Sequence, residues 1–184
     1  MAQTHGPEHS GEAITILKVD PREDRGLALR SAGQEEGGRL ADVHSAYHDN
    51  ISPPLEWDPV AEAQSYALIV EDPDAPRDKP FVHWMIWNIP GDARGLPQGI
   101  APHPALTEPV GAIQGRNDAG RHGWFGPRPP VGHGVHRYYF QLFALDQPLE
   151  MSPETPLVEL LNALKGHTIV KGEMMATYEA PEVQ

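Results

Sequence analysis

Residues 70–90 read V-E-D-P-D-A-P-R-D-K-P-F-V-H-W-M-I-W-N-I-P, and this stretch decides the fold. It leaves an apolar run through an acidic turn that contains three prolines. Proline fixes φ and removes a backbone donor, so the turn can be neither helix nor central strand. We expect a stiff loop that holds Asp72 and Asp74 in place. The run over 82–89 is too apolar to lie on a surface and predicts a buried strand that opens at His83.

A carboxylate on a rigid loop and a histidine at the mouth of a buried strand are components of a polar pocket. An acidic surface turn followed by a core strand would explain the same residues, since Asp-Pro pairs are common turn initiators. On this stretch alone, a surface turn followed by a core strand is favoured over a polar pocket.

Other segments predict the partners of that strand. Strands are expected over residues 13–19, 65–71, 134–146 and 168–178, with Gly172 as a candidate bulge. Alternation places Met85 and Trp87 with His83 on one face of its strand, and Trp84 and Ile86 on the other. Both faces are apolar, so this strand should be central and covered on both sides. Alternation also puts His136 and Tyr138 on one face.

One helix is predicted, over residues 155–166. Thr155 can act as the N-cap, Pro156 fits the first helical position, and Gly166 can end the helix. Four leucines between them recur at i, i+3, i+4 and i+7, so one stripe should pack on the sheet.

Length and composition favour one β-rich domain. With 184 residues, 20 prolines and 18 glycines, we expect a single domain over 13–184 behind a disordered tail at 1–12. The absence of cysteine excludes disulfides, zinc–thiolate sites and a cysteine nucleophile.

Charge and hydropathy exclude several kinds of partner. The net charge of −12 makes binding to nucleic acids or anionic membranes unfavourable. No run approaches the ~20 apolar residues of a membrane span, and the N-terminus has no apolar core of a secretory signal. These features predict a cytoplasmic protein.

Three loops stand out. A connection over 91–120 is long enough to be functional or mobile. Residues 120–130, G-R-H-G-W-F-G-P-R-P-P, could bring backbone N–H groups close to a ligand, but they lack the G-K-[ST] of a phosphate loop. Within 39–50, His44 and His48 are four apart, and a solvated loop is favoured over a metal-binding helix.

The polar groups at the strand mouths allow several chemistries. If the strands are neighbours, Asp72, His83 and His136 could converge, with Tyr138 beside them. Imidazole and phenol donors suit a small anion. A carboxylate with two histidines is also a composition found in metal sites, and it could supply general acid–base groups. His133 should point away from His136 on a strand, which counts against a shared metal.

The ordered motifs resemble a known family. D-P-D-A-P at 72–76, the histidine at 83, G-P-x-P-P at 126–130 and H-R-Y at 136–138 are similar to the two signature regions of the phosphatidylethanolamine-binding proteins. N-I-S-P-P-L-E-W, W-N-I-P and G-H-T-I-V-K-G-E-M-M-A-T-Y resemble its bacterial Raf-kinase-inhibitor-like branch. The resemblance covers residues 13–180.

The resemblance implies a mainly β fold, a Greek-key β-sandwich with a large central sheet and one or two short helices. It implies an anion pocket for phosphate-like head groups, with no catalytic residue, metal or cofactor. The implied ligand-binding residues are Asp72, His83, Gly126, Pro127, His136 and Tyr138. The bond between Ala75 and Pro76 is a candidate cis peptide.

Two departures from the family limit this transfer. No counterpart of the C-terminal helix of animal relatives follows the last strand, so their kinase and lipid roles are not carried over. Arg128 stands where bacterial relatives often have a small residue, and we expect it to point outward into solvent.

The favoured hypothesis is a non-enzymatic binding protein for a small ligand that bears phosphate or carboxylate, acting on a partner protein through the pocket. The alternatives are an inhibitor that docks through the 91–130 loops, and a hydrolase or metal enzyme that uses Asp72, His83 and His136. Bacterial relatives are often dimers, and an exposed Trp124–Phe125 pair would suit a homodimer interface.

Overall fold

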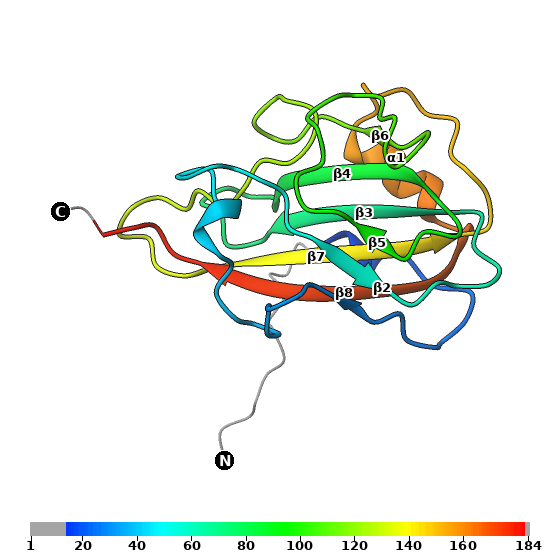
Figure 1. The fold of residues 1–184 in the computed structure, drawn as a ribbon, viewed down its shortest axis with the longest axis horizontal. Helices are drawn as coiled ribbons and strands as arrows, with labels where there is room; N and C mark the ends of the chain where they lie inside the picture. Colours follow the sequence, from blue (N-terminus) through cyan, green and yellow to red (C-terminus); the bar gives the residue numbers. More distant parts are fainter. Residues whose placement is uncertain (1–13, 183–184) are drawn as a thin grey trace, which may run out of the picture.

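The computed structural model describes residues 14–182, and within them the fold is mainly β, with two antiparallel sheets and one α-helix (Figure 1). The tail predicted over residues 1–12 lies outside this range, as does residue 13. In chain order the elements are η1 (Thr15–Lys18), β1 (Leu29–Arg30), η2 (Asp42–His44), β2 (Leu55–Trp57), β3 (Ser65–Asp72), β4 (Phe81–Pro90), β5 (Gly95–Leu96), β6 (Ile113–Gln114), β7 (His136–Leu145), α1 (Leu157–Leu164) and β8 (Thr168–Tyr178).

The larger sheet confirms the predicted central sheet. In the described part of the chain its order is β6-β4-β3-β7-β8, with every neighbour antiparallel. All residues of β3 are buried, because β4 and β7 flank it and both sheet faces are covered. In Figure 1 the long strands run side by side across the molecule. The smaller sheet has the order β1-β2-β5.

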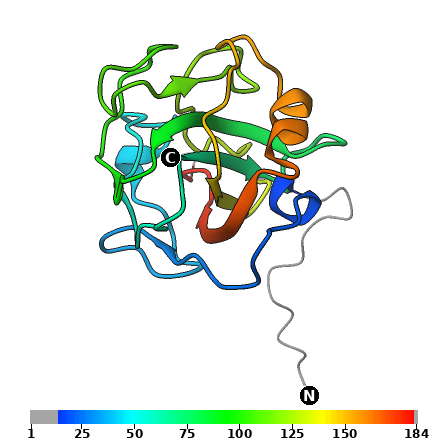
Figure 2. The same cartoon turned by 90° about the vertical axis from the view of Figure 1, so that its right-hand side faces the viewer.

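Two cores lie on opposite faces of the larger sheet. One face packs against the smaller sheet and its loops, and the other packs against η1 and α1 (Figure 2). The alternation of β7 divides its side chains between them: Tyr138 and Phe140 enter the first core, and Tyr139 and Phe143 enter the second. The ring of Trp57 packs on that of Tyr66, with the ring centroids 5.3 Å apart, as expected of a residue that leads into the sheet.

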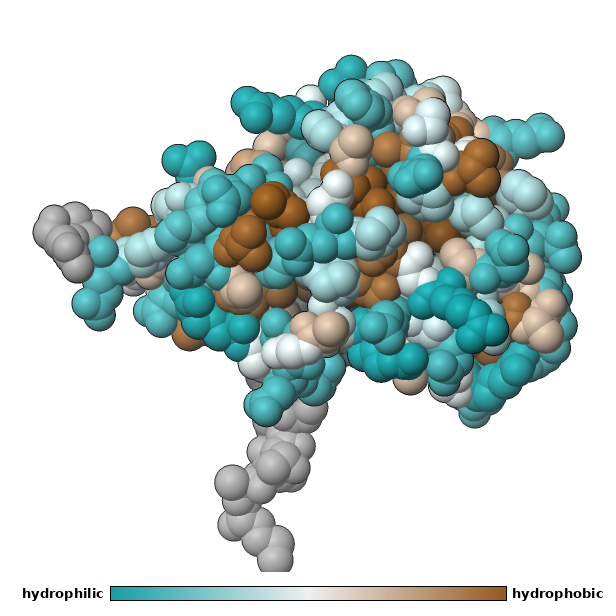
Figure 3. Space-filling model, in the orientation of Figure 1, coloured by the Kyte–Doolittle hydropathy of each residue, from teal (hydrophilic) through white to brown (hydrophobic). Residues whose placement is uncertain are grey.

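The outer face of the smaller sheet is polar. Arg30 forms exposed ion pairs with Glu56 and Asp58. Figure 3 shows this side of the molecule, where hydrophilic residues separate the apolar groups. Exposed pairs of this kind contribute about 0–1 kcal/mol each, so this face supports solubility more than stability.

The first predicted strand is wrong, because residues 15–18 form a 3₁₀-helix. Two side chains from the sheet take up its backbone donors: Glu71 accepts from the N–H of Thr15 at 2.8 Å, and Gln141 accepts from that of Ile16 at 2.6 Å. The alternation correctly indicates the buried side chains, since Ile14 and Ile16 are buried. The backbone of the segment, however, hydrogen-bonds to side chains instead of to a neighbouring strand.

A bulge in β4 overturns the predicted face of His83. Val70 pairs with Trp84 and Glu71 pairs with Val82, so His83 is an extra residue without a partner in the register. The bulge turns its ring onto Tyr138, in the core opposite to Met85 and Trp87. A β-bulge re-aims a side chain in this way.

The helix is shorter than predicted. It spans Leu157–Leu164 and its N-cap is Pro156, so Thr155 does not cap it. The buried positions of the helix, Leu160 and Leu164, belong to the predicted leucine stripe and face the second core.

Two backbone features are not where the sequence suggested. Gly172 pairs regularly with Leu142, and the irregularity in β8 falls at Ile169. Among the described residues the cis peptide bond is Glu108–Pro109, and the bond between Ala75 and Pro76 is not cis.

Candidate functional site

A cavity of about 280 Å³ opens where β3 ends and β4 and β7 begin. Four predicted residues line it: Asp72, His83, His136 and Tyr138. Its apolar walls are Ala75, Pro76, Phe81, Phe125, Pro129 and Pro130. The antiparallel order of the three strands therefore brings together residues that are up to 66 positions apart, from 72 to 138.

The carboxylate of Asp72 is fully engaged within the protein. Its Oδ1 accepts a hydrogen bond from the backbone N–H of Asp74 at 2.7 Å, and its Oδ2 accepts one from Nδ1 of His136 at 2.7 Å. Both side chains of the Asp72–His136 pair are buried. Asp72 thus positions His136 and keeps a proton on its Nδ1.

The loop between β3 and β4 is anchored by Asp74. Its carboxylate accepts three hydrogen bonds from Arg137, from the backbone N–H, Nε and Nη2, at 2.8–2.9 Å. Burial acts to raise the pKa of Asp74, but the hydrogen bonds and charge of Arg137 outweigh it and hold the pKa below its usual value. Asp74 thus attaches to β7 the loop whose prolines predict stiffness.

His83 presents one ring nitrogen to the cavity. Its Nδ1 donates to the carbonyl of Phe125 at 2.6 Å, and its ring lies among those of Phe81, Phe125 and Tyr138. Burial lowers the pKa of His83, although the Phe125 carbonyl and the Asp72 charge act in the opposite direction. The neutral ring therefore carries its proton on Nδ1 and a lone pair on Nε2.

The hydroxyl of Tyr138 is an unused donor. The residue is 0% exposed, and the hydroxyl has no hydrogen-bond partner among the described residues. Burial raises the pKa of Tyr138, with the charges of Asp72 and Asp74 adding to the effect, so the phenol stays protonated. A buried hydroxyl without a partner costs free energy, typically ~1–3 kcal/mol, unless a ligand satisfies it.

His133 contacts His136, contrary to the expectation that the two point apart. Nδ1 of His133 lies 2.6 Å from Nε2 of His136, and the rings meet edge to face. The expectation assumed that both residues belong to a strand, whereas β7 begins only at His136. His133 stands in the preceding turn between Gly132 and Gly134, both at positive φ.

Gly126 and Pro127 lie behind the cavity and do not line it. The N–H of Gly126 donates to Asn50, and a Cβ there would lie only 1.9 Å from the carbonyl oxygen of His44. The carbonyl of Pro127 accepts from Ser45. Both residues join the 123–130 loop to the 42–50 segment, which is therefore partly buried and not the solvated loop that was predicted.

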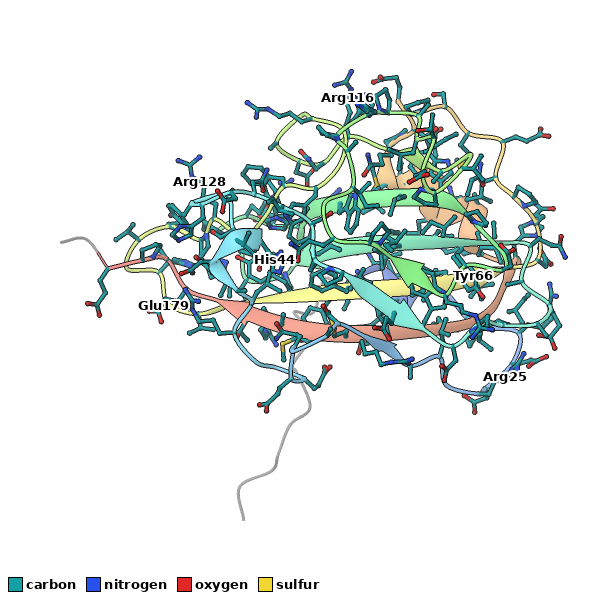
Figure 4. All side chains as sticks on the ribbon, viewed as in Figure 1. Arg25, His44, Tyr66, Arg116, Arg128 and Glu179 are labelled. Atoms are coloured by element: carbon teal, nitrogen blue, oxygen red, sulfur yellow. The ribbon has the colours of Figure 1, made fainter. Side chains whose placement is uncertain are left out.

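Two arginines line the rim. The guanidinium of Arg128 lies 5.5 Å from the ring centroid of Tyr47, and that of Arg77 lies 5.5 Å from the ring of Phe81. Both arginines are exposed, and Arg128 also borders the cavity, so its side chain does not point only into solvent as expected. Figure 4 shows Arg128 at the same end of the molecule as His44.

The predicted exposed aromatic pair is wrong. Trp124 is 8% exposed: its Nε1 donates to the carbonyl of His44, and its ring packs between Trp84 and Phe140. Phe125 is half-buried against His83. The pair therefore gives no support for a homodimer interface.

Sequence reasoning missed Arg77, Phe81, Phe125 and His133. The first three lie next to the signature motifs in the sequence. Their convergence on the cavity depends on the fold, and no local pattern predicts it. For His133 a local signal existed, since glycines on both sides release the histidine from strand geometry.

Two kinds of feature are absent from the described residues. Over residues 14–182, no three His, Asp or Glu side chains are arranged to hold a metal ion. In the same range, the helices are too short and too polar to cross a membrane.

The family model described as phosphatidylethanolamine-binding protein matches residues 30–179. An archaeal protein of Methanothermobacter thermautotrophicus, described as a UPF0098 protein, is 42% identical over 153 residues, which are 83% of this chain and 98% of the relative.

Two solved structures share the fold. A homologue of phosphatidylethanolamine-binding protein from Chlamydia trachomatis superposes with a TM-score of 0.75 at 35% identity, over 85% of this chain and 99% of that one. YbcL from E. coli, described as a new member of the mammalian PEBP family, gives a TM-score of 0.76 at 30% identity, over 85% of this chain and all of YbcL.

Proposed function

This chain belongs to the phosphatidylethanolamine-binding protein family, and from that premise we propose that it is a non-enzymatic protein that binds a small phosphate-bearing ligand in the cavity at the ends of β3, β4 and β7. In this role the ligand is a head group or a phosphorylated side chain of a partner, and the protein regulates that partner through the pocket.

The observation that carries the proposal is the hydroxyl of Tyr138. It is buried, protonated and without a partner among the described residues, and it belongs to a residue of the cavity lining. An anionic oxygen is the strongest acceptor such a donor can meet, and hydrogen bonds to charged groups contribute about 1.5–3 kcal/mol.

His83 supplies a second contact. In the free protein its Nε2 carries a lone pair, so it accepts from the O–H of a monoprotonated phosphate or takes up a proton and donates to a dianion. An anion beside the ring favours its charged form and raises its pKa. Binding should therefore be accompanied by proton uptake below about pH 7.

The rim and the size of the cavity fit the same ligand. Arg128 places a positive charge at the mouth of the cavity in a chain whose net charge is −12, and Arg77 adds a second guanidinium that is paired with Asp118 at 3.2 Å. Guanidinium groups match phosphate geometry, and the apolar walls would cover the carbon atoms attached to it. A cavity of about 280 Å³ can hold a phosphate with a short organic group.

The enzyme alternative gains no support from the geometry. The two oxygens of Asp72 accept hydrogen bonds from Asp74 and His136, and Nε2 of His136 accepts one from His133. Both residues are thus hydrogen-bonded within the protein, and of the three residues named by that alternative His83 alone keeps a ring nitrogen unoccupied by the described residues. The docking alternative through the 91–130 loops has likewise no specific contact in its favour, since Gln114 and Trp124 of that segment are buried.

The test is calorimetric titration with inorganic phosphate and with phosphoethanolamine at about pH 6 and pH 8, the range in which imidazoles titrate. The expected result is saturable binding that is stronger at the lower pH. Acetate as a competitor distinguishes a phosphate site from one that takes any small carboxylate.

Tyr138→Phe removes one oxygen and keeps the ring, so it should weaken binding by about 10-fold or more without unfolding the protein. Tyr139→Phe is the matched control, because Tyr139 is adjacent in β7 but faces the other core. No binding by the wild type at either pH, or equal binding by both variants, would overturn the proposal.

A further inference from the structure

One imidazole of the cavity lining has both of its ring nitrogens engaged. His136 lines the cavity, its Nδ1 is held by Asp72 at 2.7 Å, and its Nε2 is 2.6 Å from Nδ1 of His133. Because Nδ1–H of His136 donates to the carboxylate, Nε2 of the neutral ring is an acceptor, and His133 must be the donor.

His133 itself is held loosely. It is an exposed residue of a turn, and within residues 14–182 its one other hydrogen bond runs from its backbone N–H to the carbonyl of Pro130 at 3.1 Å. Gly132 and Gly134 on either side have φ of +79° and +89°, and a Cβ on either would meet no atom within 4 Å. His133 thus stands in an exposed turn between two glycines whose surroundings are open.

We propose that His133 is an internal competitor of the ligand: it occupies His136 at neutral pH, and it is released when both imidazoles are protonated or when an anion takes its place. This inference rests on the proposed function and adds the regulation of that site by pH.

The chemistry of the pair explains the release. A neutral or singly protonated pair can share an N–H···N hydrogen bond, because one ring still offers a lone pair. Two protonated rings have no lone pair and repel each other, so the contact breaks. The Nε2–H of His136, a residue of the cavity lining, is then without its partner and can donate to an anion.

Other charged or titratable groups surround the pair on every element packed against it. They are Asp72 and Asp74 after β3, Arg77 in the loop, His83 on β4, Arg128 on the rim, Arg137 and Tyr138 on β7, and Tyr178, the β8 register partner of His136. Asp74 and Arg137 neutralise each other, and both tyrosines stay protonated because burial raises their pKa values. Burial lowers the pKa of His83, which favours its neutral form.

The first test needs no ligand. Ring ¹⁵N NMR of the wild type should show the His133–His136 hydrogen bond at about pH 8 and its loss at about pH 5, the range in which imidazoles titrate. In His133→Ala the Nε2 signal of His136 should lack the bond at both pH values. A wild-type spectrum that matches the variant at about pH 8 would overturn the inference.

The second test measures inorganic phosphate binding by the wild type and by His133→Ala. At about pH 8 the variant should bind about 3- to 10-fold more tightly, because no internal hydrogen bond must be broken, and at about pH 5 the two affinities should converge. Val135→Ala is the matched control, since Val135 is an exposed side chain in the same turn.

The outcomes separate the two proposals. If the wild type and His133→Ala bind phosphate with the same pH profile, the competitor role is overturned and the proposed function stands. If neither protein binds phosphate at either pH, the proposed function is overturned, and the competitor role with it.

Discussion

Arg137 and Asp74 are joined by two parallel hydrogen bonds, from Nε to Oδ2 and from Nη2 to Oδ1, each 2.8 Å long. Asp74 belongs to the loop after β3, and Arg137 follows His136 in β7. The pair therefore fastens the loop to the sheet beside the cavity, and it fixes the neighbouring carboxylate of Asp72 in the position from which it holds His136.

Asp74→Asn should lower the free energy of unfolding by about 1–3 kcal/mol, because an amide loses the charge and turns one acceptor into a donor that faces the guanidinium. Urea denaturation measures the loss. Asp78→Asn is the control: Asp78 is exposed in the same loop and has no hydrogen bond or ion pair with any described residue. Equal losses in the two variants would show that the Asp74–Arg137 pair does not stabilise the loop.

His83 should make stability depend on pH. Burial lowers its pKa in the folded protein, so below about pH 6.5 the unfolded chain binds the proton more readily than the folded one. The free energy of unfolding should therefore fall as the pH falls from about 8 to 5, by at most ~1.4 kcal/mol per pH unit from this residue.

His83→Gln should remove this contribution, so its stability deficit relative to the wild type should be smaller at about pH 5 than at about pH 8. Urea denaturation at both pH values measures the difference. His103→Gln serves as the control, because the side chain of His103 is exposed. A deficit that stays constant with pH would contradict the assignment to His83.

The long strands could be predicted because their sequences are apolar over a length that suits a strand. β3, β4, β7 and β8 all lie within one or two residues of their predicted bounds. The short segment before Lys18 has the same apolar alternation, yet it is a 3₁₀-helix, because Glu71 and Gln141 satisfy its backbone from the sheet. No local pattern reports a partner that is 56 residues away.

The positions of the pocket residues were only partly predictable. Asp72, His83, His136 and Tyr138 surround one cavity, as the family resemblance implied, while their role in ligand binding stays a prediction. Strand alternation failed for His83, because a bulge is set by the pairing of two strands and not by the sequence of one. It failed for His133 because the strand begins three residues later.

The indoles of Trp84 and Trp87 are both fully buried in β4 but differ in one hydrogen bond. Nε1 of Trp84 donates to Oε1 of Gln114 at 2.7 Å, and Gln114 in turn binds the carbonyl groups of Ala101 and His103. Nε1 of Trp87 has no partner among the described residues. Each Trp→Phe change removes a similar volume, so the comparison isolates the hydrogen bond.

Trp84→Phe should be less stable than Trp87→Phe by about 1–3 kcal/mol, because it leaves the Gln114 oxygen buried without a donor. Urea denaturation of both variants measures the difference. If the two variants are equally stable, or if Trp87→Phe is the weaker, the hydrogen bond to Gln114 does not fasten the 91–120 segment to the sheet.

Gly172 lies where β8 passes the backbone of Leu27. A Cβ at this position would stand 1.7 Å from the carbonyl oxygen of Leu27 and 2.7 Å from its carbonyl carbon. Since the obstacle is backbone, it cannot be relieved by a change of rotamer, and either β8 or the segment before β1 must move. Gly172→Ala should therefore lower the free energy of unfolding by about 1–3 kcal/mol or more.

Gly26→Ala is the matched control for that change, because Gly26 is one residue from Leu27 and a Cβ there would meet no atom within 4 Å. Its φ is not in the left-handed region, so alanine should be neutral or stabilise by about 0.4–1 kcal/mol through the unfolded chain. Thermal unfolding should thus shift in opposite directions for the two variants, or downward for Gly172→Ala alone. If Gly172→Ala unfolds at the wild-type temperature, the contact between β8 and Leu27 is loose, and the glycine is not required for close packing of the segment before β1 against β8.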